Sequence, residues 1–265
     1  MTGTSTLGRL FFATSVVALG IRQLLTGEFV RLVPPLPAWI PWHPFWPYLV
    51  GVVLIVAGTA IGMGTGRMAR WASLVLGAMI LFAFLCLHLP LAVADPLVGF
   101  RWTNPCKALA MLGAVILLAG SLPPETDRAS GLKRGFRRVS FLGPLFLGGF
   151  LILGGIQHFV YADFVTQLVP AWIPGRHAWT YITGVALIAG GVGMLVLKTA
   201  RLAALMSGIM MFLWVVLLHI PRALADLGNV GETSGVFEAL ALSGAAFILA
   251  DRGSPQKRRH PSEES

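Results

Sequence analysis

Charged side chains are scarce in this sequence. Asp, Glu, Lys and Arg make up 12% of its 265 residues, whereas hydrophobic residues make up 56% and the mean hydropathy is +0.78. A soluble domain of this length carries about twice that share of charge. The composition therefore excludes an ordinary soluble globular protein and indicates a chain that resides in a lipid bilayer.

Cysteine and the common cofactor motifs are also rare or missing. The two cysteines, Cys86 and Cys106, form no CxxC pair and no zinc-ligand spacing, although a disulfide between two spans stays open. The sequence contains no haem-attachment motif, no dinucleotide-binding motif and no nucleophile elbow. The formal net charge of +9 comes without any nucleic-acid-binding signature, so no nucleic acid is expected as a partner.

Eight apolar segments approach the length of a membrane-crossing helix, which needs about 17–25 residues. They are continuously apolar rather than alternating, which favours helices over a β-barrel. The predicted spans cover residues 10–25, 48–64, 71–89, 107–122, 141–160, 181–197, 202–219 and 237–250. The sequence thus predicts an all-α membrane protein with eight transmembrane helices, surrounded by the lipid bilayer.

The chain repeats itself. The motif PAWIP at residues 37–41 recurs at 170–174, and the motif HxP at 88–90 recurs at 219–221. Self-similarity of this kind indicates a tandem repeat. It divides the chain into a first four-helix unit (1–122), a basic linker (123–139), a second four-helix unit (140–251) and a disordered polar tail (252–265).

The repeat and the basic residues predict a topology. Because each unit has an even number of spans, the two units are parallel repeats. Most of the 20 Lys and Arg residues lie in the N-terminus, in the loops after the second, fourth and sixth spans, or in the tail. This bias places both termini in the cytoplasm of a multi-pass protein of the cell (inner) membrane. The outer loops then carry interfacial tryptophans, namely Trp39, Trp46, Trp172 and Trp179.

Polar and ionisable side chains gather near the outer ends of the spans. The second unit offers a candidate polar pocket of His158, Asp163, His219, Arg222, Asp226 and Glu238, and the first offers Gln23, Glu28, His88, Asp95 and Lys107. An ionisable group at membrane depth costs about 2.5–3.5 kcal/mol or more unless it is paired or wetted, so it is retained for a reason. Such groups can relay a proton or donate a hydrogen bond to a quinone carbonyl. The alternative is that they are wetted at the interface and only cap helix ends.

The histidine of each HxP motif precedes an aspartate by seven residues, as His219 precedes Asp226. On an uninterrupted helix the two side chains share one face. The alternative is that Pro221 makes the helix end at the histidine and restart, which turns the aspartate elsewhere. A metal site built from the histidines and aspartates of the second unit has no tight ligand spacing in its support, so no metal is expected.

The order of these motifs resembles the DoxX and DoxX-like family of four-span membrane proteins. The second unit carries GIQHF at 155–159, PAWIP at 170–174, YITG at 181–184, ARLA at 200–203 and HIP at 219–221. The resemblance extends over both units, from about residue 10 to residue 250, and so implies a tandem duplication. It implies a membrane location and an association with thiosulfate:quinone oxidoreduction or related membrane complexes. Gln23 departs from the family pattern, which has a histidine there, and this makes the first unit the weaker or purely structural copy.

The residues and the resemblance together predict a quinone-associated component of a membrane redox system. Its pockets lie at the outer face, and its electrons come from a bound cofactor or a redox partner protein. Two alternatives stay open. One is a non-catalytic membrane scaffold or assembly factor, and the other is a small-solute carrier. Because the second unit holds the fuller polar set, we expect function to depend on it more than on the first.

Overall fold

A computed structural model describes residues 3–30, 36–37, 39–64, 66–96, 99–122, 134–135 and 138–251. Over these residues the chain forms eight helices that are long and apolar enough to cross a membrane. The prediction of an all-α, multi-pass membrane protein is therefore confirmed at this level. Most of the predicted linker (123–139) and all of the predicted tail (252–265) lie outside the described residues.

The spans have these bounds. The first four are α1 (Gly3–Thr26), α2 (Phe45–Met63), the continuous segment of α3 (Gly66–Ala83), η1 (Phe84–His88) and α4 (Leu89–Val93), and α5 (Thr103–Ser121). The last four are α7 (Leu142–Val160), α9 (Arg176–Leu195), the continuous segment of α10 (Ala200–Trp214), η3 (Val215–His219) and α11 (Ile220–Ala225), and α12 (Val230–Asp251). Two short helices, η2 (Gly99–Trp102) and α8 (Ala162–Leu168), lie in the connections.

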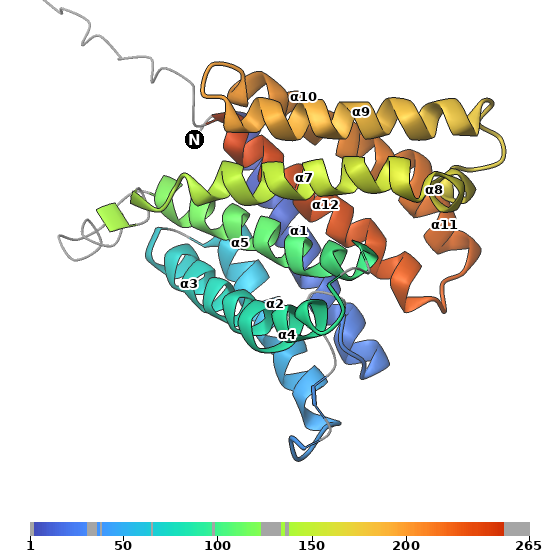
Figure 1. The fold of residues 1–265 in the computed structure, drawn as a ribbon. Coiled ribbons are helices and arrows are strands. Elements are labelled where there is room, and N and C mark those ends of the chain that lie inside the picture. Colours follow the sequence, from blue (N-terminus) through green and yellow to red (C-terminus); the bar gives the residue numbers. More distant parts are fainter. Residues whose placement is uncertain are drawn as a thin grey trace, which may run out of the picture.

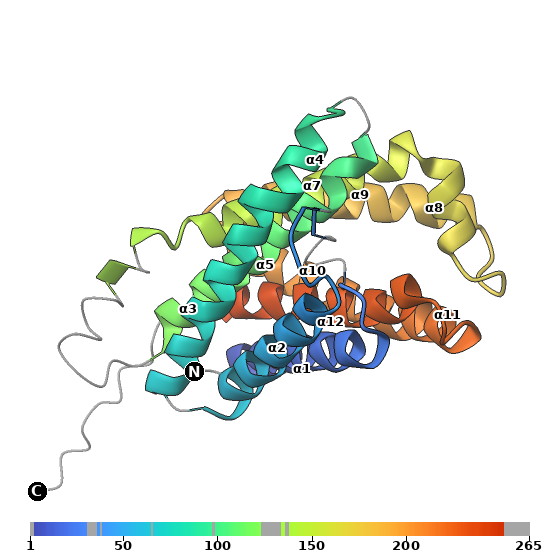
Figure 2. The same ribbon diagram turned by 90° about the horizontal axis from the view of Figure 1, so that it is seen from below.

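The spans form two layers (Figure 1, Figure 2). One layer runs α3, α5, α7, α9, and the other runs α2, α1, α12, α10. The α2–α3 and α9–α10 contacts join the two layers at their edges. Within the second layer, α12 packs along α1 and so connects the two halves of the chain. The α5–α12 contact crosses the centre, and these two spans are the most buried, at 61% and 72% of their apolar windows. The core therefore lies between the fourth span of each unit.

Glycines allow close helix crossings between the first and second spans of each unit. A β-carbon at Gly20 of α1 would lie 2.7 Å from the carbonyl oxygen of Gly51 in α2. A β-carbon at Gly155 of α7 would lie 2.7 Å from the carbonyl oxygen of Gly184 in α9. In lipid, where apolar side chains gain little from leaving their surroundings, small residues at crossings are the main route to tight helix packing.

A second set of glycines lies where the two halves meet. A β-carbon at Gly8 of α1 would lie 2.6 Å from the carbonyl oxygen of Gly244 in α12. At the α5–α7 crossing, a β-carbon at Gly113 would lie 3.2 Å from the backbone of Gly143. The fourth span of each half thus packs on the first span of the other half.

The third span of each half passes its HxP motif without a break. The turns η1 and η3 are π-helical: Leu89 N–H donates to Phe84 O, and Ile220 N–H donates to Val215 O. A proline inside a regular α-helix clashes with the carbonyl four residues earlier and leaves it unbonded. The wider turn just before the proline relieves that conflict, so the helix continues to Val93 or Ala225. The alternative of a break at the histidine is therefore wrong.

Several helices are longer than the apolar runs that predicted them. α1 begins at Gly3 and α12 at Val230, where the predicted spans began at residues 10 and 237. The added turns carry polar residues that hydropathy assigns to loops. They form helix because backbone hydrogen bonding and packing continue past the apolar run. The start of α1 and the end of α12 lie at the same end of the bundle (Figure 1).

Candidate functional site

The centre of the candidate site is an ion pair between the halves. Lys107 Nζ of α5 lies 2.5 Å from Glu238 Oε2 of α12, and the two side chains are 14% and 6% exposed. Lys107 Nζ also donates to Asn104 Oδ1, one turn earlier, at 3.4 Å. The sequence placed Lys107 and Glu238 in two separate candidate pockets, and the structure brings them together.

His219 lies beside this ion pair. It ends η3, and a β-carbon at Gly235 of α12 would lie 3.3 Å from His219 Nδ1. The charges of Arg222, Glu238, Glu232 and Lys107 all act on the His219 ring. The polar cluster therefore contains groups from α5, the η3–α11 segment and α12.

Arg222 is held in the same region by a residue that sequence reasoning missed. Its guanidinium Nη2 lies 2.5 Å from Glu232 Oε1, at the start of α12, and both side chains are about one quarter exposed. Glu232 was missed because it precedes the apolar run that marked the eighth span. The available signal was that Glu232 is an acidic residue ten positions after Arg222, for which the sequence had suggested no acidic partner.

His158 is near the cluster on α7 but is engaged locally. Its Nδ1 lies 2.7 Å from Gly154 O, and its ring stacks on Trp214 with centroids 6.3 Å apart. The preceding residue, Gln157, accepts a hydrogen bond from Thr103 Oγ1 at 3.0 Å. Thr103 and Lys107 lie one turn apart on α5, so α7 reaches the edge of the polar cluster through Gln157.

The two aspartates of the predicted second pocket are exposed. Asp163 lies in the first turn of α8, and Asp226 follows α11 in a non-helical conformation. Neither is among the charged groups that act on His219. The structure thus brings together His219, Arg222 and Glu238 of the predicted set and adds Lys107.

The polar residues of the first unit have separate local roles. Gln23 is fully buried; its Nε2 donates to Pro47 O at 2.7 Å and its Oε1 accepts from Val30 N at 3.2 Å. Gln23 thereby ties the loop after α1 to the start of α2.

The other members of that predicted pocket are dispersed. Glu28 is exposed, whereas His88 is buried at the end of η1. Asp95 forms an exposed ion pair with Arg101 at 3.5 Å. Because Lys107 binds Glu238 instead, the five residues predicted to line a pocket in the first unit do not form one cluster.

The four tryptophans expected in the outer loops lie in the connections before α2 and α9 or in the first turn of these helices, and they are largely on the surface. Trp39, Trp172 and Trp179 are exposed. Trp46 is less exposed, and its indole Nε1 donates to Pro41 O at 3.0 Å. Exposed indoles near the ends of membrane spans are typical of an interfacial belt.

Cys86 and Cys106 are free thiols. Among the residues that the structure describes, no group of three His, Cys, Asp or Glu side chains is arranged to hold a metal ion. The four residues considered for a metal site, His158, Asp163, His219 and Asp226, do not come together as such a group.

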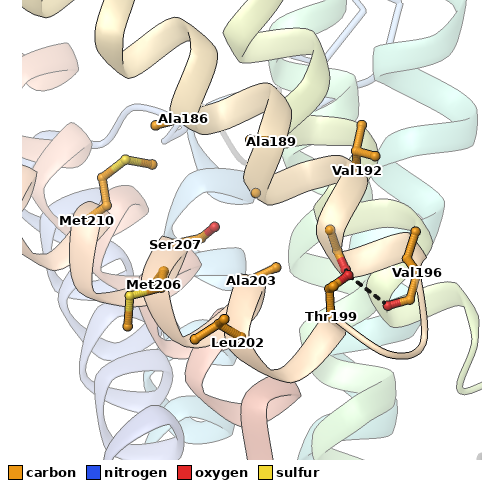
Figure 3. Close-up of a pocket in the computed structure, with 12 residues that line it drawn as sticks. Ala186, Ala189, Val192, Val196, Thr199, Leu202, Ala203, Met206, Ser207 and Met210 are labelled. Atoms are coloured by element: carbon orange, nitrogen blue, oxygen red, sulfur yellow. Dashed lines mark hydrogen bonds between the residues drawn. The ribbon is translucent and has the colours of Figure 1, made fainter.

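A separate apolar cavity of about 520 Å³ lies between α9 and α10 (Figure 3). Small residues on both helices form it, including Ala189, Gly190, Gly193 and Ser207, with Met206 and Met210 nearby. It extends to Val196 and Thr199 at the α9–α10 turn, at the opposite end of α10 from His219. It is therefore distinct from the polar cluster.

Comparison with protein-family models gives a match over part of the chain. A family model described as a domain of unknown function (DUF8561) matches residues 147–247. This range extends from α7 into α12 and includes His219, Arg222, Glu232 and Glu238. No curated protein and no solved structure matches the chain.

Proposed function

We propose that the chain consists of two parallel four-helix repeats with both termini in the cytoplasm of the cell (inner) membrane. The glycine contacts support this arrangement. The Gly20–Gly51 crossing in the first unit corresponds in position to the Gly155–Gly184 crossing in the second. The two contacts between units, α12 on α1 and α5 on α7, are equivalent in the same way. The basic residues of the N-terminus and tail favour the cytoplasmic orientation.

We also propose that the protein is a DoxX-like, quinone-associated component of a membrane redox system. The observation that carries this proposal is the polar cluster of His219, Lys107 and Glu238 within apolar membrane-spanning helices. Charged groups at such a depth are retained mainly at sites of binding or transfer. A membrane ligand with a polar headgroup and an apolar tail suits a cluster near the end of a span.

The chemistry of the cluster matches a quinone headgroup. A quinone has two carbonyl oxygens that accept hydrogen bonds. His219 lies against Gly235 of α12, and the Lys107 ammonium binds Glu238 about one turn further along the same helix, so an imidazole N–H and an ammonium can both donate here. The electrons would pass to or from a redox partner protein, because the cluster itself contains acid–base groups and no redox-active side chain.

Mass spectrometry of organic extracts of the purified protein tests the proposal. A quinone should co-purify with the wild-type protein and be lost in the His219→Ala variant. The matched control is His43→Ala, because His43 is exposed in the first outer loop. Absence of quinone from folded wild-type protein, after purification in a mild detergent with retained lipid, would contradict the proposal.

A membrane scaffold or assembly factor is the second candidate, favoured by the position of the ion pair. Lys107 and Glu238 join α5 to α12 across the centre of the fold, and a purely structural pair would have the same geometry. A scaffold would lose its partner protein on mutation but would bind no quinone. Co-purification of partners beside the extraction experiment distinguishes the two candidates.

A further inference from the structure

Among the residues that the structure describes, two buried side-chain oxygens on one face of α12 have no hydrogen-bond partner. They are Ser234 Oγ and Glu238 Oε1, in side chains of residues that are 0% and 5% exposed. Residues four apart on a helix lie one above the other on the same face. A buried polar atom without a partner costs about 1–3 kcal/mol, so a pair of them on one face needs a physical explanation.

The surroundings determine what these oxygens can accept. Glu238 Oε2 is held by the ammonium of Lys107, so the carboxylate has no proton to donate and Oε1 is an acceptor. The Ser234 hydroxyl can both donate and accept. The next residue is Gly235, whose missing side chain lets the His219 ring pack against α12 beside this face. An acceptor, a hydroxyl and an imidazole therefore lie within about one turn of α12.

In the first unit, the hydroxyl at the position that matches Ser234 already has a hydrogen-bond partner within the protein. Thr103 of α5 corresponds to Ser234 in the repeat, and the Thr103 hydroxyl already donates to Gln157 Oε1 of α7. The residue of α1 that corresponds to Gln157 is Arg22. Its guanidinium instead reaches the carbonyl oxygens of Leu227 and Gly228. The hydroxyl is therefore bonded within the protein in one unit and unpartnered in the other.

We propose that Glu238 Oε1 and Ser234 Oγ recognise a hydroxyl group of the bound ligand, and that the site prefers a quinol to its quinone. This inference rests on the proposed function, because that function names the ligand class. A quinol hydroxyl donates to Glu238 Oε1 and accepts from Ser234. A quinone offers only acceptors and leaves the glutamate oxygen unbonded. A hydrogen bond to a charged group contributes enough for about a 10- to 100-fold difference in affinity.

The test compares binding of a labelled short-chain quinol and its quinone to the full-length protein in lipid nanodiscs, under anaerobic conditions. Empty nanodiscs supply the correction for partitioning into lipid. We expect the wild-type protein to bind the quinol about 10- to 100-fold more tightly than the quinone. Ser234→Ala should weaken quinol binding by about tenfold and leave the ion pair intact. Glu238→Gln should remove the preference, because an amide both donates and accepts.

Ser243→Ala is the matched control on the same helix. The Ser243 hydroxyl already donates to Gly208 O at 2.8 Å, so its loss should leave both affinities unchanged. Equal affinities for quinol and quinone in the wild type would overturn this inference and leave the proposed function standing. An unchanged preference in folded Ser234→Ala and Glu238→Gln proteins would also overturn it. Binding of neither form would remove the proposed function itself.

Discussion

The two halves of the chain differ at matched positions near the ends of their helices. Gln23 in α1 is fully buried and ties the following loop to α2, whereas its counterpart His158 in α7 is partly exposed and stacks on Trp214. Thr103 in α5 has a bonded hydroxyl, whereas its counterpart Ser234 in α12 does not. The first unit uses its polar groups to fix loops and contacts. The second leaves Ser234 Oγ and Glu238 Oε1 without a hydrogen-bond partner among the described residues.

The Lys107–Glu238 pair shows what the proposed repeat within one chain would permit. The two residues are 131 apart, the same spacing that separates His88 from His219, so they occupy matched positions in the repeated motifs of the sequence. In a symmetric dimer of one four-helix unit, a residue at this contact would face its own copy. Two lysines or two glutamates there would repel each other. A single chain can place opposite charges at equivalent positions and so turn that contact into an ion pair.

The largest expected effect comes from breaking this central pair. Glu238→Ala leaves the Lys107 ammonium buried without its carboxylate and should lower the free energy of unfolding by about 3–5 kcal/mol. The exchange Lys107→Glu with Glu238→Lys should recover most of that loss, because the two positions are equivalent. Thermal unfolding in detergent measures both. If the protein with both charges exchanged is no more stable than Glu238→Ala, the surroundings of the two positions are not equivalent and each favours its own charge.

The next effect concerns the two equivalent crossings between units. Gly244→Ala should lower stability by about 1–3 kcal/mol, because a β-carbon at Gly244 would lie 2.6 Å from Gly8 O and 2.8 Å from Phe12 N. Gly113→Ala at the other crossing should cost less, since its nearest contacts are 3.2 Å away. Thermal unfolding of the two variants, with Gly149→Ala as an unhindered control, makes the comparison. A larger loss of stability in Gly113→Ala than in Gly244→Ala would show that the α5–α7 crossing, not the α1–α12 crossing, is the tighter one.

The matched pair Gln23 and His158 should give a smaller difference. Gln23→Ala removes two buried hydrogen bonds that hold the connection between α1 and α2 and should cost about 1–3 kcal/mol. His158→Ala removes one local hydrogen bond and a stacking contact, for about 0.5–1.5 kcal/mol. Limited proteolysis of the α1–α2 connection adds a local readout, which should respond to Gln23→Ala alone. Equal proteolysis in both variants would contradict the anchoring role of Gln23.

The smallest effect is expected at the exposed ion pair of the first unit. Arg101→Ala removes the contact with Asp95, in which both side chains are more than 40% exposed, and should change stability by about 0–1 kcal/mol. Arg222→Ala, at the less exposed pair with Glu232, should have the larger effect. Thermal unfolding at low and high salt checks this order. A salt-independent loss in Arg101→Ala would mean that its contribution is not the ion pair.

Much of the helical architecture follows from hydropathy alone. Continuous apolar runs must cross a bilayer as helices, because unsatisfied backbone groups are too costly in lipid. The eight spans were found in this way, with errors at the ends such as the polar first turns of α12. Those turns contain Glu232 and Ser234, two residues of the candidate site that hydropathy could not assign.

The candidate site was only partly accessible to sequence reasoning. His219, Arg222, Glu238 and Lys107 were singled out because ionisable residues near membrane spans are unusual. The pairing of Lys107 with Glu238, and the Glu232 partner of Arg222, were not predicted, because the spacing along one helix says nothing about which helices touch. The sequence shows that Lys107 and Glu238 stand at matched positions of the repeat, but their contact depends on α5 packing against α12.

The sequence by itself determined that this protein is a helical membrane protein, because low charge and long apolar runs have one stable outcome in lipid. It also determined that the chain repeats, since the motifs recur in order. Only the tertiary structure decided that the fourth span of each unit packs on the first span of the other. It also decided that HxP is crossed by a π-helical turn and that Lys107 meets Glu238. The two packing features depend on side-chain volume and backbone approach between distant segments, which local sequence patterns do not encode. The π-helical turn has a local cause in the proline, but the sequence left it open whether the helix would break or continue there.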